Sequence, residues 1–197
     1  MYKKQIRFQK FACILAILTA AVTFIYSLGI ITDIYDSLYA TMMNPKDLTQ
    51  TYVPGSIIYY DMQQFNQQYL YCGIGLILLG AFLFVTNTHT RRKYYIGNYV
   101  AIVAYCVATA AVGIWSHLQI SAFKVQYLTT VDFEALKAFA ELWGYTYIES
   151  TLLLDLHYGV AALGVVAMAG LLVSMVWKIR MMRQEQALID QGKEALV

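Results

Sequence analysis

The sequence has few charged residues: Lys, Arg, Asp and Glu make up 13% of its 197 residues, whereas 59% are hydrophobic. Soluble domains usually carry about 25% charged residues, so this composition favours a protein whose main solvent is lipid. The basic residues lie beside apolar segments and form no separate patch, which excludes the usual surface for nucleic acid. A chain of this length predicts a single domain, residues 1–197.

Paired cysteines and catalytic motifs are also missing. The three cysteines, Cys13, Cys72 and Cys106, all fall within apolar runs, where a lone thiol usually acts as a small buried side chain. A disulfide-stapled exported segment would carry paired cysteines in its polar loops. The sequence contains no Gly-rich phosphate loop, no H-E-x-x-H and no G-x-S-x-G. We therefore predict no catalytic residue and no cofactor, and we expect a protein that is not an enzyme.

Four long apolar runs are present instead. A helix needs about 20 mostly apolar residues to cross a bilayer. These runs are apolar all round, whereas a membrane-barrel strand would alternate. The predicted fold class is an all-α membrane protein with four transmembrane helices, an antiparallel bundle of two hairpins with helical extracytoplasmic extensions. The predicted spans are residues 11–31, 69–85, 96–118 and 152–177.

The basic residues predict the orientation of these spans. Eleven of the fourteen lie before the first span, between the second and third, or after the fourth, and the others are Lys46, Lys124 and Lys137. By the positive-inside rule both termini, including the tail 178–197, are cytoplasmic. The longer segments 32–68 and 116–151 then lie outside. The sequence has no N-x-Ser/Thr sequon, which fits a bacterial plasma membrane, so we predict a multi-pass protein there.

The predicted outer segments are structured and aromatic. Ser56 is a suitable N-cap for a helix leading into the second span. Thr130 or Asp132 caps a short amphipathic helix in the other segment, because apolar residues recur there at helical spacing. This helix packs on the protein's own outer part or binds a partner, and the many tyrosines allow an extracytoplasmic ligand. The candidate partner-interface residues are Phe133, Leu136, Phe139, Trp143, Tyr59 and Tyr60.

Three ionisable residues near the outer ends of the spans are candidates for chemistry. His117 follows the third span and His157 lies just inside the fourth, an outline that a paired-histidine haem or metal site shares. The alternative is that both are hydrogen-bonding residues between helices. Asp155 is the acid inside a predicted span, and such residues are functional candidates. It is two residues from His157, on the opposite face of the helix, and it either meets water or pairs with Lys124 or Lys137.

Small residues recur along the spans and predict close helix packing. They occur in all four predicted spans, at Ala12, Ala16 and Ala20, at Gly73, Gly75 and Gly80, at Ala104 and Ala108, and at Gly159, Gly164 and Gly170.

The function predicted from these features is a non-catalytic integral membrane subunit, an accessory or stabilising partner in a larger membrane complex such as a transporter. Its partners are then the lipid bilayer and other integral membrane proteins. One alternative is a haem- or metal-binding redox protein that uses His117 and His157. Another is a homo-oligomeric carrier or channel built around Asp155.

Overall fold

The computed structural model describes residues 2–44, 46–89, 96–144 and 150–194, and helix dominates them. The long helices are α1 (Tyr2–Thr41), α2 (Ile58–His89), α3 (Ile96–Thr130) and α5 (Leu152–Glu194), and α4 (Phe133–Trp143) is short. Each of the four long helices contains a segment long and apolar enough to cross a membrane. The prediction of an all-α chain with four such helices is therefore confirmed.

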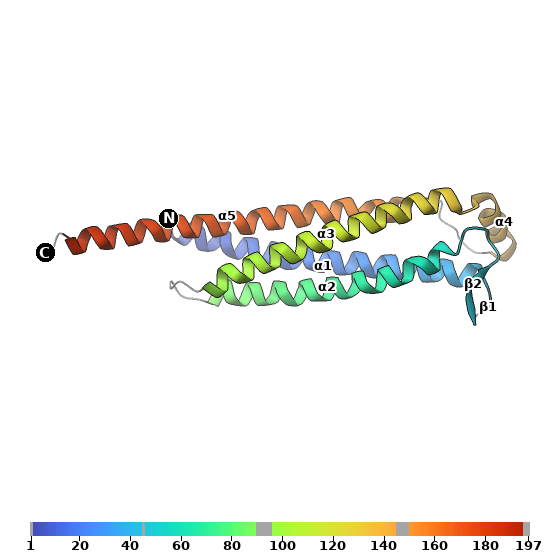
Figure 1. The fold of residues 1–197 in the computed structure, drawn as a ribbon, viewed down its shortest axis with the longest axis horizontal. Helices are drawn as coiled ribbons and strands as arrows, with labels where there is room; N and C mark the ends of the chain where they lie inside the picture. The colour runs from blue at the N-terminus through green and yellow to red at the C-terminus, as the bar shows by residue number, and fades with distance from the viewer. Residues whose placement is uncertain (1, 45, 90–95, 145–149, 195–197) are drawn as a thin grey trace.

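The four long helices lie side by side in one elongated bundle (Figure 1). Helix α1 packs against α2 and α5, and α3 packs against the same two helices, so the order around the bundle is α1, α2, α3, α5. The chain reverses direction from each long helix to the next (Figure 1). We call the end with α4 and the strands the capped end, and the end where α1 begins and α5 finishes the terminal end.

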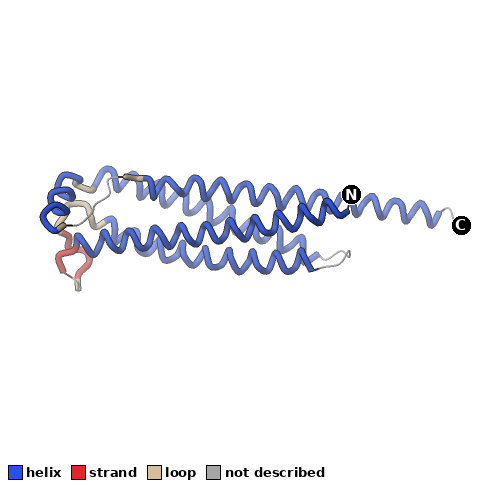
Figure 2. The backbone as a smooth tube through the Cα atoms, turned by 180° about the vertical axis from the view of Figure 1, so that it is seen from behind, coloured by secondary structure: helices blue, strands red, loops and turns tan. Residues whose placement is uncertain are grey.

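A β-hairpin and α4 cover the capped end (Figure 2). Strands β1 (Met42–Asn44) and β2 (Asp47–Thr51) pair antiparallel, with Met42 opposite Thr51 and Asn44 opposite Asp47. The next turn joins the two halves of the cap, because the Asp132 amide donates a hydrogen bond to the Pro54 carbonyl at 3.1 Å.

Short polar contacts set where the helices at the capped end begin. Asp132 is the N-cap of α4, because its carboxylate accepts a hydrogen bond from the Ala135 amide at 3.0 Å. The prediction that Ser56 is the N-cap of the helix leading into the second span is wrong. Its hydroxyl donates to the Val53 carbonyl at 2.7 Å instead of capping a helix, and α2 begins at Ile58. The hydroxyl thus stabilises the preceding turn.

The helices are longer than the predicted spans. At about 1.5 Å per residue the 40 residues of α1 extend about 60 Å, twice the roughly 30 Å of a bilayer's hydrocarbon core. Helix α5 has 43 residues and projects past the start of α1 at the terminal end (Figure 1). Much of each of these helices therefore lies outside any bilayer that the bundle crosses.

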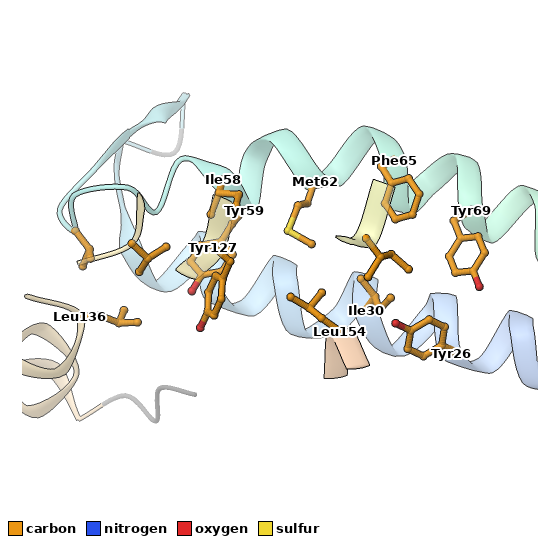
Figure 3. Packing of buried hydrophobic residues seen from close by; sticks show 13 residues of the cluster. Tyr26, Ile30, Ile58, Tyr59, Met62, Phe65, Tyr69, Tyr127, Leu136 and Leu154 are labelled. Atoms are coloured by element: carbon orange, nitrogen blue, oxygen red, sulfur yellow. The ribbon is translucent and has the colours of Figure 1, made fainter. Parts of the chain in front are cut away.

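The buried apolar side chains form two clusters along the bundle axis. The capped cluster includes Tyr26, Phe65, Tyr69, Tyr127 and Leu154, and Figure 3 shows these aromatic and aliphatic groups between α1 and α2 and beneath the cap. The terminal cluster contains smaller groups, among them Ala12, Cys13, Ala16, Leu83, Tyr105 and Leu171. Large side chains thus fill the capped half, whereas small ones let the helices come close in the other half.

Some of the predicted small-residue faces do pack. Ala12, Ala16 and Ala20 are buried, and a side chain added at Gly73 would lie 3.0 Å from the backbone of Phe24. Others face outward, because Ala104 is exposed and Gly75 and Gly159 have no neighbour that an added Cβ would touch. Four-residue spacing therefore identified the packed face of α1 but not that of α3.

Candidate functional site: an interhelical cavity

A cavity of about 400 Å³ lies between the two clusters, inside the bundle. All four long helices contribute to its wall, and its volume falls in the range of about 300–1,000 Å³ that small-molecule sites usually have. Most of the wall is apolar. The polar residues in the wall are Thr19, Thr23, Tyr69, Thr109, Ser116, His117 and His157.

Small residues on two neighbouring helices leave this space open. Ala110 and Gly113 line the cavity from α3, and Ala161 and Gly164 line it from α5. Within each pair the residues are three apart, so they share one face of their helix. The two helices approach closely beside the gap, where an added Cβ on Gly164 would lie 3.4 Å from the Thr109 methyl group.

The cavity opens to the side of the bundle. Ile114 and Leu118 of α3 and Val165 of α5 line it and are also about 60% exposed, so they flank its mouth. All three lie within the predicted spans 96–118 and 152–177, on helices that are apolar enough to cross a membrane. In a bilayer the mouth would therefore face lipid.

The two histidines are brought into direct contact at the cavity wall. Nδ1 of His117 lies 3.0 Å from Nε2 of His157, and Nδ1 of His157 hydrogen-bonds to the Leu154 carbonyl. A carbonyl oxygen can only accept, so Nδ1 of His157 carries a proton. In the neutral pair His117 then donates from Nδ1 to Nε2 of His157, and Nε2 of His117 has no proton.

This contact joins α3 to α5 as a direct hydrogen bond between the two rings. Their separation of 3.0 Å is that of an ordinary hydrogen bond. Within the described residues no three His, Cys, Asp or Glu side chains are grouped to hold a metal. As they stand, the rings form a hydrogen-bonded unit between two helices.

Asp155 is engaged on another side of α5. One carboxylate oxygen lies 2.5 Å from the Lys124 ammonium group, and the other accepts a hydrogen bond from the Thr151 hydroxyl at 2.9 Å. Both partners of the ion pair are about one third exposed. Of the two lysines that the sequence offered, Lys124 is the partner, and the pair ties α3 to α5 near the capped end.

The six partner-interface candidates separate into three pairs. Tyr59 and Leu136 are buried in the capped cluster, and Phe133 and Phe139 pack partly against it. Trp143 and Tyr60 are exposed. In the described fold, therefore, the amphipathic face of α4 covers the protein's own core, and the surface it leaves open is at its C-terminal end.

Two features of the site were not predicted. Thr109 has a buried hydroxyl without a hydrogen-bond partner of normal geometry in the described part of the chain, and Leu142, beside Trp143, is the most exposed large apolar residue there. A usable signal for the cavity was the helical spacing of Thr109, Gly113 and Ser116, which places two hydroxyls and a gap on one face of an apolar span.

Comparisons with known proteins provide no relative. No family model matches the sequence, and searches of curated proteins and of solved structures found no significant match.

Proposed function

We propose that this protein is a non-catalytic, multi-pass membrane subunit that docks onto another integral membrane protein. The observation that carries the proposal is that large apolar side chains are exposed on two parts of the chain that lie beyond the predicted spans, one at each end of the bundle. Leu142 (77%) and Trp143 (61%) lie at the end of α4, and Leu188 (69%) and Ile189 (53%) lie on the projecting end of α5. Exposed apolar groups outside a bilayer favour a protein partner.

The orientation belongs to the same proposal. The start of α1 and the end of α5 share the terminal end, and the basic residues flank these helix ends. The positive-inside rule places that end in the cytoplasm of a bacterial cell and the capped end outside. A single partner that covers both exposed sites must then cross the membrane itself, which is why an integral membrane protein is the proposed occupant.

The hydrogen bonds and the ion pair of the ionisable residues support a structural role for these side chains. His117 and His157 bond to each other, and Asp155 bonds to Lys124 and Thr151. Each interaction connects helices or fixes a helix end. These side chains therefore contribute to a rigid scaffold that presents α4 and the end of α5 to a partner.

Co-purification tests the proposal. The tagged full-length chain is extracted from its native membranes in a mild detergent, and bound chains are quantified by mass spectrometry. We expect a stoichiometric membrane partner whose recovery falls about tenfold when Leu142 and Trp143 are both changed to Ser, and likewise with Leu188 and Ile189. Glu141→Gln on the same helix α4 is the matched control and retains the partner. A wild-type monomer or pure homo-oligomer would refute the proposal.

A further inference from the structure

The interhelical cavity has the features of a ligand site, independently of any protein partner. It is mainly apolar, its mouth between α3 and α5 is flanked by exposed apolar residues, and its polar lining includes the histidine pair. We infer that it binds an uncharged, lipid-soluble alcohol or phenol that enters from the bilayer and donates its hydroxyl hydrogen to Nε2 of His117.

The wall of the cavity excludes a charged ligand. None of the described residues in this wall is Lys, Arg, Asp or Glu, so an ionised headgroup would find no partner of opposite charge among them. Moving an unpaired charge from water into such an environment is strongly unfavourable, by more than any single hydrogen bond returns. Phospholipids and fatty-acid anions are therefore poor occupants, and an uncharged molecule is favoured.

The hydrogen-bonding pattern of the two histidines favours a ligand that donates a hydrogen bond. The Leu154 carbonyl fixes the proton on Nδ1 of His157, and Nε2 of His157 accepts from His117. The remaining nitrogen, Nε2 of His117, can only accept in the neutral pair. No other described residue hydrogen-bonds to it, so an alcohol or phenol satisfies it, whereas a ketone, ether or ester does not.

Binding of a matched pair of probes tests the inference. The full-length protein in lipid nanodiscs is equilibrated with tritiated 4-nonylphenol or its methyl ether, 4-nonylanisole, and uptake by empty nanodiscs is subtracted. We expect saturable binding of one phenol per chain, at least tenfold tighter than binding of the ether, because only the phenol donates a hydrogen bond. Equal affinity, or no saturable phenol binding, would overturn the inference.

Two variants locate the site. Ala110→Phe fills the cavity and is expected to abolish phenol binding, whereas Val107→Phe, on the exposed side of the same helix and outside the cavity, is expected to retain it. Wild-type affinity in a folded Ala110→Phe protein would overturn the inference. If that variant does not fold, the comparison of phenol with ether on the wild-type protein decides alone.

An NMR measurement on the wild-type protein tests whether Nε2 of His117 accepts the hydrogen bond of the ligand. With ¹⁵N-labelled histidine, assigned by comparison with His117→Gln, the unprotonated Nε2 of His117 should shift on addition of 4-nonylphenol and remain in place with 4-nonylanisole. An unchanged resonance at saturating phenol would contradict the assignment of this nitrogen as the acceptor.

Discussion

The hydroxyl of Tyr105 donates a hydrogen bond to the backbone carbonyl of Ala16 across the interior of the bundle, at 2.6 Å. Tyr105 is on α3 and Ala16 is on α1, which are opposite each other in the helix order, and the tyrosine side chain is fully buried. This single side chain therefore connects the two helices that share no direct face, within the cluster of small residues near the terminal end.

Tyr105→Phe removes that connection and leaves the ring in place. We expect the free energy of unfolding to fall by about 0.5–1.5 kcal/mol, the usual net contribution of an intramolecular hydrogen bond. The measurement is thermal or denaturant unfolding in detergent. Tyr71→Phe is the control, because Tyr71 is on the exposed surface of α2, and it should leave stability unchanged. Equal effects of the two changes would contradict the role assigned to Tyr105.

The contact between α1 and α2 makes a second prediction. A side chain at Gly73 would lie 3.0 Å from the Cα of Phe24, whereas one at Gly75 would meet nothing within 4 Å. Gly73→Val should therefore force the helices apart and destabilise the protein by about 1–3 kcal/mol, the usual range for overpacking. Gly75→Val, two residues away on the same helix, should be close to neutral. The comparison of the two melting temperatures in one detergent checks this.

Gly55 fixes the cap to the bundle. Its φ of 81° favours glycine, and an added Cβ would overlap the Thr130 carbonyl oxygen. Gly144 has a similar φ of 72° but open space around it. Gly144→Ala therefore suffers only backbone strain, about 1–2 kcal/mol, whereas Gly55→Ala also separates the cap from α3.

Limited proteolysis distinguishes these two outcomes. We expect cleavage in the β-hairpin and around α4 to be much faster in Gly55→Ala than in Gly144→Ala. Identical cleavage rates in the two variants would show that the contact between Gly55 and Thr130 does not hold the cap.

The ion pair of Lys124 and Asp155 predicts that the stability of the protein depends on opposite charges at these two positions. Reversing one partner, by Asp155→Lys, places two ammonium groups together and should lower the melting temperature. Exchanging both, by Lys124→Asp with Asp155→Lys, should restore part of the loss, because the two groups are 2.5 Å apart in the structure. A double variant less stable than the single one would argue against the pairing.

The sequence was sufficient for the coarse architecture because that depends on composition over long segments. Runs of about 20 apolar residues predict helices wherever they occur, and a capping aspartate followed by apolar residues at helical spacing located α4. Structural details that depend on single contacts could not be predicted from the sequence. The β-hairpin has five residues in its longer strand, and nothing in Asp47–Thr51 alternates strongly enough to predict it.

The candidate site was predicted only in part for a related reason. The proximity of His117 and His157 followed from their similar depth on sequential helices. Their direct hydrogen bond, which depends on helix rotation and on the Leu154 carbonyl, did not. The cavity could not be predicted, because a gap results from several small residues on different helices facing one another. Gly113 and Gly164 line that gap whereas Gly159 does not, although all three look alike in the sequence.

The most direct test of the proposed docking role is site-specific photo-crosslinking in intact cells. A photoreactive amino acid replaces Leu142, Leu188 or, as a control inside the bundle, Leu83, which is fully buried. The account predicts that Leu142 and Leu188 each cross-link to the same integral membrane protein and that Leu83 captures no other chain. Cross-links from Leu142 and Leu188 only to lipid, or only to a second copy of this chain, would contradict it.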